Sequence, residues 1–258
     1  MTLAITELSD LGIAMAADSA VTFGSGRVLV GAQKLQPVRQ LNAGVSIWGY
    51  ACVQGKIADE WVYEFIQNYT PDNPSVWSFA EALANELQSV LGVIDSYMGI
   101  HVAGYEDTQD GRLPAFYHVH NGHHQYVLVD GKLCLQGEPP REFRAHKDVS
   151  PRRFDPSHSS HLTRNGDFFL HAALFNRLGG LMGELQQLTG LEFPYPRTLA
   201  ARGEYLRFWV NLAGEIYRLS NKRARVLPQP ETAGDASIGG PVTVLTISER
   251  GIESFYTK

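Results

Sequence analysis

The chain has 258 residues, and its 22 Lys and Arg residues against 27 Asp and Glu residues give a net charge of −5. Hydrophobic residues make up 44% of the sequence and charged residues 19%, which is typical of a folded protein with a full core. The acidic balance argues against a basic face for nucleic acid, and no run of 18 apolar residues indicates a membrane span.

The first fifty residues predict an antiparallel sheet. Residues 3–6 and 12–17 are apolar segments joined by the turn-forming residues 8–12, which is the pattern of a hairpin. A second pair of strands is indicated over 27–35 and 44–50, the latter apolar enough for burial on both faces.

Two helices are expected next, because apolar residues recur at helical spacing over 56–69 and 75–91. Pro71 and Pro74 separate them, and Ser75 is a plausible N-cap for the second. Strands return over three short segments bounded by turn residues: 99–105, 115–119 and 125–129.

Residues 137–165 hold four prolines and few aliphatic residues, so we expect a long exposed loop there. Two further helices are predicted over 168–188 and 198–223, and a closing hairpin over 241–247 and 251–256.

Strands and helices that alternate in groups favour a layered α+β domain over βαβ units. We predict a four-layer αββα sandwich, in which two antiparallel sheets stack face to face and helices cover both outer faces. One domain is expected to span residues 1–258, with the segment 137–165 as an exposed insertion.

The start of the chain carries a chemically suggestive set of residues. Thr2 follows Met1, Asp18 ends an apolar strand in the run Ala-Ala-Asp-Ser, Lys34 lies 16 residues after Asp18, and Gly49 closes a buried strand. This pattern resembles the N-terminal threonine hydrolases, meaning proteasome β subunits and HslV-type peptidases. In that family the acid and the lysine lie 16 and 32 residues after the nucleophilic threonine, and both spacings are met here.

The chemistry of these residue types fits the resemblance. The hydroxyl of Thr2 needs a base, and the free α-amine of an N-terminal threonine, which titrates at about 7.7–8.0, can supply one once Met1 is removed. A buried Lys34 would favour the alkoxide and keep that amine neutral, and Asp18 would orient Lys34. The resemblance places a backbone donor for the developing oxyanion at Gly49.

Other segments depart from the family pattern. Ala20 stands where many active β subunits carry an arginine, and Arg164-Asn165-Gly166 stands where the family has Gly-Ser-Gly. Asp235 matches an acid of the family, whereas Ser237 falls one position early. These departures indicate a divergent bacterial branch and leave two alternatives: a catalytically silent ring subunit, or a small-molecule amidase of the same fold.

The resemblance also implies partners. We expect a homo-oligomeric ring, more specifically a stacked double ring, with peptides or unfolded proteins as substrates. The large aromatics of the first two helices, Trp61, Trp77 and Phe79, exceed what one core face needs and favour subunit contacts. The chain has no Walker-type sequence, so any ATP-driven unfoldase would be a separate protein.

The remaining signals are weaker. Four histidines, His118, His120, His123 and His124, flank an Asn-Gly turn, where we expect solvated side chains rather than a metal site. We expect no metal and no cofactor. Cys52 and Cys134 are too few and too far apart for a disulfide framework, and the first residues lack the regions of a signal peptide, so we expect a cytoplasmic protein.

Overall fold

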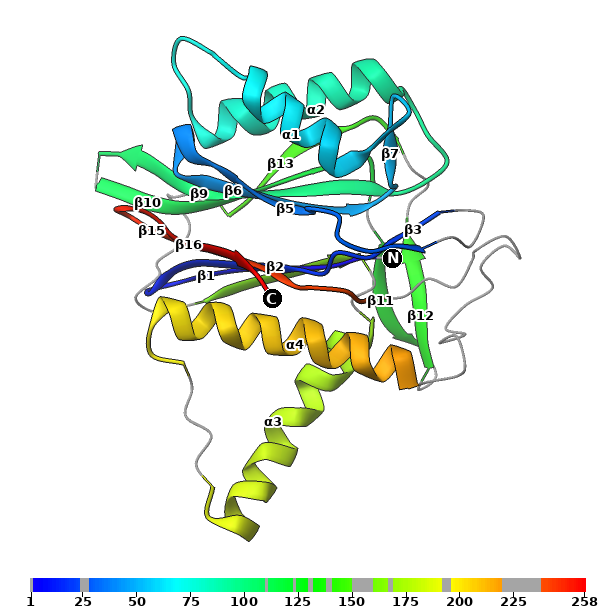
Figure 1. Cartoon of the computed structure of the whole chain (residues 1–258), viewed down its shortest axis with the longest axis vertical. Helices are drawn as coiled ribbons and strands as arrows, with labels where there is room; N and C mark the ends of the chain where they lie inside the picture. Colours follow the sequence, from blue (N-terminus) through cyan, green and yellow to red (C-terminus); the bar gives the residue numbers. More distant parts are fainter. Residues whose placement is uncertain are drawn as a thin grey trace.

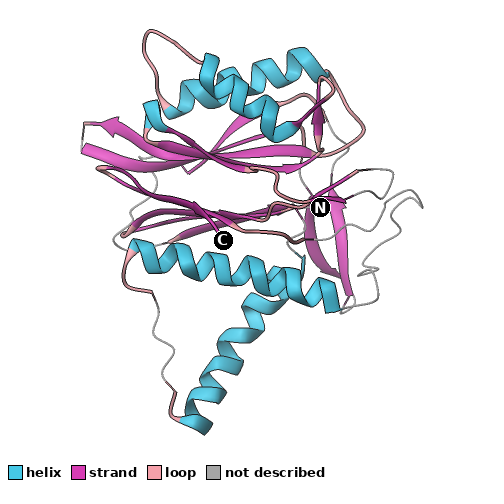
Figure 2. Ribbon diagram, in the orientation of Figure 1, coloured by secondary structure: helices cyan, strands magenta, loops and turns pink. Residues whose placement is uncertain are grey.

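A computed structural model gives the fold of the chain, and two five-stranded antiparallel sheets form its centre (Figure 1). The two sheets stack face to face, and helices lie outside them (Figure 2). The structure describes residues 2–23, 28–109, 111–122, 124–129, 132–137, 141–149, 160–166, 169–191, 196–219 and 238–258.

The first sheet, called sheet A, contains the start of the chain. Its strands lie in the order β14 (His161–Gly166), β1 (Leu3–Ser9), β2 (Gly12–Ala17), β15 (Thr243–Ser248) and β16 (Gly251–Thr257). Because β1 pairs with β14 on one side and β2 on the other, backbone hydrogen bonds hold the first residues of the chain from both sides.

The second sheet, called sheet B, follows in sequence. Its strands lie in the order β13 (Arg144–Val149), β10 (Gly111–His120), β9 (Met98–Thr108), β6 (Ala43–Gly49) and β5 (Leu35–Val38), with a 3-10 turn at Arg39–Leu41. The described residues also form three two-stranded ribbons: β3 (Val21–Thr22) with β4 (Val28–Leu29), β7 (Cys52–Val53) with β8 (Lys56–Ile57), and β11 (His124–Val129) with β12 (Lys132–Gly137).

The two sheets approach each other closely. Leu8, Ile13 and Met15 of sheet A pack against Leu35 and Phe116 in one buried cluster. Gly44 of β6 lies directly against sheet A, because a Cβ built on it would lie 2.2 Å from Leu245 Cδ2. A larger residue at this position would require the side chains of Leu245 and Met15 to move.

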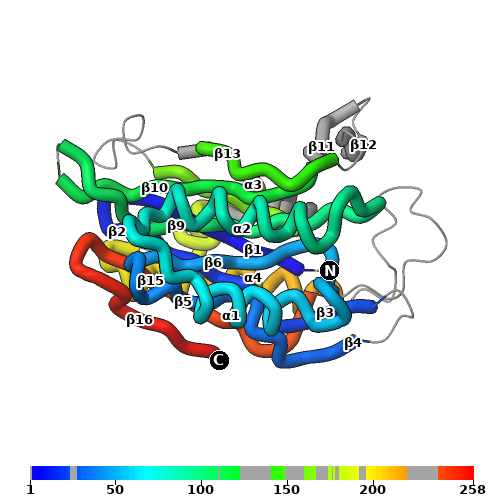
Figure 3. The backbone as a smooth tube through the Cα atoms, turned by 90° about the horizontal axis from the view of Figure 1, so that it is seen from above, coloured from blue at the N-terminus to red at the C-terminus, as the bar shows by residue number. Residues whose placement is uncertain are grey.

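Helices α1 (Ala58–Asn68) and α2 (Val76–Leu91) cover the outer face of sheet B, side by side in the view from above (Figure 3). Ser75 caps α2 as predicted: its side chain accepts from Ser78 N–H, and the Ser78 side chain accepts from Ser75 N–H.

The prediction that the helix aromatics are surplus to the core is wrong for Trp61 and Phe79, whereas Trp77 is partly buried. Trp61 and Phe79 are buried, with 6% and 0% of their surface exposed, and Phe65 packs between them. Trp77 packs on Tyr117 of β10, and the Lys147 ammonium lies 3.9 Å from its ring centre. The helices contact each other as well as the sheet, so each buries more than one face.

The two helices on the side of sheet A differ in how they pack against it. Helix α4 (Leu199–Leu219) packs along the sheet through Leu206, Trp209 and Val210. Helix α3 (Phe169–Thr189) projects away from it (Figure 1). The predicted α+β class is therefore confirmed for the described residues, whereas the complete four-layer sandwich stays a prediction.

Two predicted elements differ in the structure. The strand expected over 27–35 is limited to β4 and the first residue of β5, because the backbone between them bonds to a loop and a helix: Ala32 N–H donates to Ser19 O, and Gln33 N–H to an Asp59 carboxylate oxygen. The segment 137–165, expected as a loop, contributes β13 and β14. Both are edge strands, which pair on one side only and need little apolar character; residues 138–140 and 150–159 lie outside the described part.

Candidate active site

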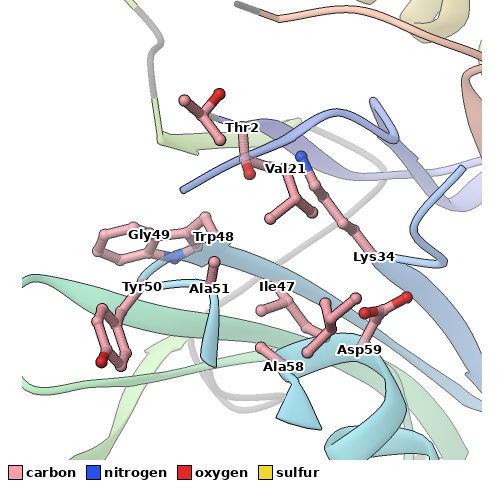
Figure 4. Close-up of a pocket in the computed structure, with 12 residues that line it drawn as sticks. Thr2, Val21, Lys34, Ile47, Trp48, Gly49, Tyr50, Ala51, Ala58 and Asp59 are labelled. Atoms are coloured by element: carbon pink, nitrogen blue, oxygen red, sulfur yellow. The ribbon is translucent and has the colours of Figure 1, made fainter. Parts of the chain in front are cut away.

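Three of the four residues singled out in the sequence line one cavity. Thr2, Lys34 and Gly49 line a pocket where β1, β6 and the start of α1 meet, and its empty volume of about 360 Å³ includes space open to solvent (Figure 4). Asp18 lies behind Lys34, its carboxylate bonded to the lysine ammonium. The structure therefore brings together all four residues, which lie at the ends of four different strands.

Asp18 organises this region through four hydrogen bonds. Its Oδ1 accepts from Leu3 N–H at 2.9 Å and from Lys34 Nζ at 3.2 Å. Its Oδ2 accepts from Ala20 N–H at 3.1 Å and from Gly239 N–H at 3.2 Å. Gly239 begins the described part that leads to the closing hairpin; Asp235 and Ser237 themselves lie outside the described residues.

Lys34 is a buried cation, with 5% of its surface exposed. Burial lowers the pKa of the Lys34 ammonium, and the neighbouring carboxylates of Asp18 and, more weakly, Asp59 act in the opposite direction. Its Nζ also donates to the Ala20 carbonyl, so Ala20 serves through its backbone.

Thr2 is 6% exposed and is held by strand pairing of its neighbour Leu3 with Gly166. Gly166 has φ of 87°, and a Cβ on it would lie 1.8 Å from the Thr2 carbonyl oxygen. Only glycine fits here. The stretch Arg164-Asn165-Gly166 therefore supports Thr2 through its last residue; Met1 lies outside the described residues.

Gly49 ends β6 at the cavity wall. Its φ is 88°, and a Cβ on it would lie 2.2 Å from the Tyr97 carbonyl oxygen. The next residue, Tyr50, donates its N–H to that same carbonyl at 2.9 Å. This turn is the reason for glycine at the position where an oxyanion donor is expected.

Sequence reasoning missed a tryptophan–histidine contact beside Gly49. Trp48 lines the cavity, its ring packs on Gly99, and its Nε1 donates to His118 Nε2 at 3.1 Å. His118 in turn lies 3.7 Å from an Asp148 carboxylate oxygen. These contacts fix one wall of the cavity.

The expectation of solvated histidines is wrong for His118 and His120, which are both buried. The reason is that β10 extends up to the predicted turn and ends at His120, where both histidines pair with β9 and β13, and His118 packs against His101, which bonds Thr6 of the other sheet. Within the described residues, no three His, Cys, Asp or Glu side chains are grouped so as to hold a metal ion. His123 lies outside the described part.

A second missed histidine lies deeper. His101 Nδ1 lies 2.9 Å from Thr6 Oγ1 and its Nε2 lies 2.8 Å from Asn165 Oδ1, which joins β9 to the strands that hold Thr2. Burial lowers the pKa of His101 to about 4, so the ring is neutral at pH 7. The apolar pattern of its strand gave no signal for this contact.

Asp59, in the first turn of α1, was also missed. It lines the cavity, and its Oδ2 accepts from the Gln33 N–H at 2.6 Å. An acid in a first helical turn is common for reasons of helix stability, so the sequence alone does not mark it as a site residue.

Comparison with solved structures relates this fold to Anbu proteins. The Gly-1 mutant of Anbu from Hyphomicrobium sp. strain MC1 matches 100% of this chain and 86% of its own, with 12% identity and a TM-score of 0.53. Another Anbu structure from that strain matches 99% and 86%, with 13% identity and a TM-score of 0.51. Anbu from Yersinia bercovieri, described as an ancestral β-subunit, matches the same shares with 13% identity and a TM-score of 0.48.

These similarities correct the family named from the sequence. The similar structures are Anbu proteins, a family distinct from the proteasome β subunits and HslV-type peptidases. At these identities the likeness concerns the fold alone. No protein-family profile matches the sequence, and no curated protein does.

None of the described helices has the length and apolar character needed to cross a bilayer.

Proposed function

We propose that this chain is an amide hydrolase, and more specifically a peptidase, whose nucleophile is Thr2 after removal of Met1. The observation that carries the proposal is the convergence of Thr2, Lys34 and Gly49 on one cavity, with Asp18 bonded to Lys34. The Anbu-like fold supports it only at the level of architecture.

The first half of the reaction forms an ester. Thr2 Oγ1 attacks the substrate carbonyl carbon while its proton passes to the α-amine of the same residue. The negative charge that develops on the carbonyl oxygen is stabilised by the Gly49 N–H. The amine then returns the proton to the leaving nitrogen, the C–N bond breaks, and an acyl ester on Thr2 remains.

Water completes the cycle. It attacks the ester carbonyl with the α-amine again as base, the C–O bond to Thr2 breaks, and the threonine hydroxyl and a free acid result. Lys34 stays positive through Asp18 and favours both the neutral amine and the oxygen anion. Substrates of this proposal are peptides or unfolded chains.

We also propose a homo-oligomer, with a ring as its form and an ATP-driven unfoldase as a separate partner, in the cytoplasm. Leu181, Leu185 and Leu188 favour subunit contacts, because they are exposed at helical spacing along α3. Native mass spectrometry tests this: a particle near the 28.6 kDa of one chain at micromolar concentration contradicts it and favours a small-molecule amidase.

Intact mass and an epoxyketone label test the nucleophile. We expect a mass that lacks Met1 and a covalent adduct that needs both the amine and the hydroxyl of Thr2. Thr2→Ala removes the label and turnover, whereas Thr70→Ala, at an exposed threonine between α1 and α2, keeps both. A retained Met1 in active protein refutes the mechanism, and an unlabelled chain without Met1 indicates the silent subunit.

A further inference from the structure

Trp48 and Gly49 share the peptide group that supplies the proposed oxyanion donor (Figure 4). Because this group is planar, the direction of the Gly49 N–H depends on how the Trp48 backbone is held. The pairing of β6 with β5 ends at Ser46, with one further bond from Ile47 N–H to the Lys34 carbonyl. The pairing with β9 continues to Gly49. The last peptide group of β6 is therefore held by strand pairing from one side.

The side chain of Trp48 supplies a second attachment. The residue is 3% exposed, and its ring lies over Gly99 of β9, where a Cβ would be 2.4 Å from Trp48 Cζ2. This glycine leaves room for the indole to cross β9 and reach β10. There the Trp48 Nε1 donates to His118 Nε2 at 3.1 Å. An indole has one polar atom, so His118 accepts the one conventional hydrogen bond that this side chain can donate.

This contact defines the protonation state of His118. Because an indole N–H can only donate, the Nε2 of His118 accepts, and the imidazole is neutral with its proton on Nδ1. The Asp148 carboxylate oxygen 3.7 Å from Nδ1 favours that position of the proton. The buried ring also packs edge-on against His101, with the ring centres 5.2 Å apart. His118 therefore holds the Trp48 indole from a fixed orientation.

We propose that His118 is a positioning residue for the oxyanion donor: it anchors the Trp48 indole, and through Trp48 it sets the direction of the Gly49 N–H. The inference rests on the proposed function for the role of Gly49, but its effect on the Gly49 N–H can be measured without turnover. Among the described residues that line the cavity, Trp48 is present and His118 is not. His118 acts on the reaction only through Trp48.

Two substitutions at His118 separate its hydrogen bond from its volume. His118→Leu removes the acceptor and leaves the Trp48 N–H buried without a partner, whereas His118→Gln keeps an oxygen that can accept from it. A donor that acts in the transition state contributes to kcat. For a fluorogenic peptide we expect kcat to fall at least about tenfold in His118→Leu, with KM within about threefold of the unmodified chain. His118→Gln is expected to keep kcat within about threefold.

Trp48→Phe tests the same bond from its other end, and it also serves if His118→Leu does not fold. It removes the donor and keeps an aromatic ring over Gly99. We expect a loss of kcat like that of His118→Leu, and no further loss when the two are combined, because each removes the same hydrogen bond. Losses that multiply in the double variant contradict an action of His118 through Trp48.

An NMR measurement observes the Gly49 N–H directly. The chain has four tryptophans, and Trp48 is the one followed by glycine. Protein labelled with carbon-13 at tryptophan carbonyls and nitrogen-15 at glycine therefore gives a single signal in a carbonyl-filtered amide spectrum, from the peptide group between Trp48 and Gly49. We expect this signal to move in His118→Leu and to keep its position in His118→Gln.

His146→Leu is the matched control. His146 pairs with His118 from β13, on the side of β10 opposite to the strand that carries Trp48, and its side chain is exposed. We expect this variant to keep both kcat and the Gly49 signal. An unmoved Gly49 signal in His118→Leu overturns the proposal, and so does an equal movement in His146→Leu. If the unmodified chain cleaves no peptide and takes no label, the hydrolase proposal fails, while the Gly49 signal still decides whether His118 positions this N–H.

Discussion

Leu3 and Lys34 donate hydrogen bonds to the same oxygen, Oδ1 of Asp18, at 2.9 Å and 3.2 Å. One donor is the backbone of the residue after Thr2, and the other is the buried ammonium at the cavity. The position of Thr2 relative to Lys34 is therefore set through a single carboxylate group. This arrangement predicts that the Asp18 charge matters for folding and for activity together.

Asp18→Asn is expected to lower the free energy of unfolding by about 3 kcal/mol, because Lys34 stays buried without its bonded anion. The asparagine amide has only one oxygen that can accept hydrogen bonds, whereas the two carboxylate oxygens of Asp18 together accept four. We expect kcat/KM for peptides to fall at least about 100-fold. Urea unfolding and peptide kinetics check both, with Asp10→Asn in the exposed hairpin turn as control. Activity within tenfold of the unmodified chain contradicts the assigned role.

Stability is expected to depend on pH through His101. Its pKa is about 4 in the folded protein against 6.5 for an unperturbed ring, so between these values the unfolded chain binds a proton that the folded chain does not. Stability due to this group therefore falls as pH falls from 6.5 to 4, by about 3 kcal/mol in total.

Urea unfolding at several pH values between 4 and 7 measures this effect. His101→Gln keeps hydrogen-bonding groups next to Thr6 and Asn165 but has no titrating ring. The difference between the two proteins is the quantity of interest, since other groups contribute equally to both. Identical pH dependence in the two proteins would rule out His101 as the cause.

Gly166→Ala is expected to disturb the start of the chain. The left-handed backbone costs about 1–2 kcal/mol with a Cβ, and that Cβ displaces the Thr2 carbonyl oxygen. We expect a fall in kcat/KM of at least about tenfold, since misplacement of a reacting group is costly. Gly180→Ala is the matched control: it lies in α3 with open space around it, and there alanine stabilises the helix by about 0.5–1 kcal/mol.

A buried ion pair between Glu7 of β1 and Arg202 joins sheet A to α4. Burial raises the pKa of Glu7, and Arg202 opposes this. Removal of either partner alone is expected to cost about 3–5 kcal/mol, whereas Glu7→Leu with Arg202→Met costs less than either, because no charge then stays buried alone. A double-mutant cycle by urea unfolding measures the coupling. The exposed pair of Glu215 and Arg218 is the reference, with an expected coupling under about 1 kcal/mol; equal couplings would contradict the burial argument.

Local patterns in the sequence were sufficient for much of the fold. The first hairpin, the helix α2 with its Ser75 cap, and the closing hairpin follow from periodicity and turn residues that lie within about twenty positions of each other. The edge strands β13 and β14 did not follow, because their pairing depends on the neighbouring strands of each sheet rather than on their own apolar pattern.

The burial of several side chains depends on tertiary packing and could not be predicted from the composition of single elements. Trp61 and Phe79 looked surplus when each helix was considered alone, and they became core residues once α1 and α2 lay together on sheet B. His118 was expected in a strand but with a solvated side chain beside the turn, and the structure buries that side chain. In both cases burial depends on neighbours that are distant in sequence.

For the site, the sequence by itself singled out Thr2, Asp18 and Lys34, since they lie on one short stretch whose spacing matches the resemblance described above, and their proposed roles stay a prediction. Only the tertiary structure placed Gly239 on Asp18 across 221 positions and Asp59 in the cavity. The physical reason is that hydrogen bonds and charges act over a few ångströms, and chain folding alone decides which distant residues come within that range.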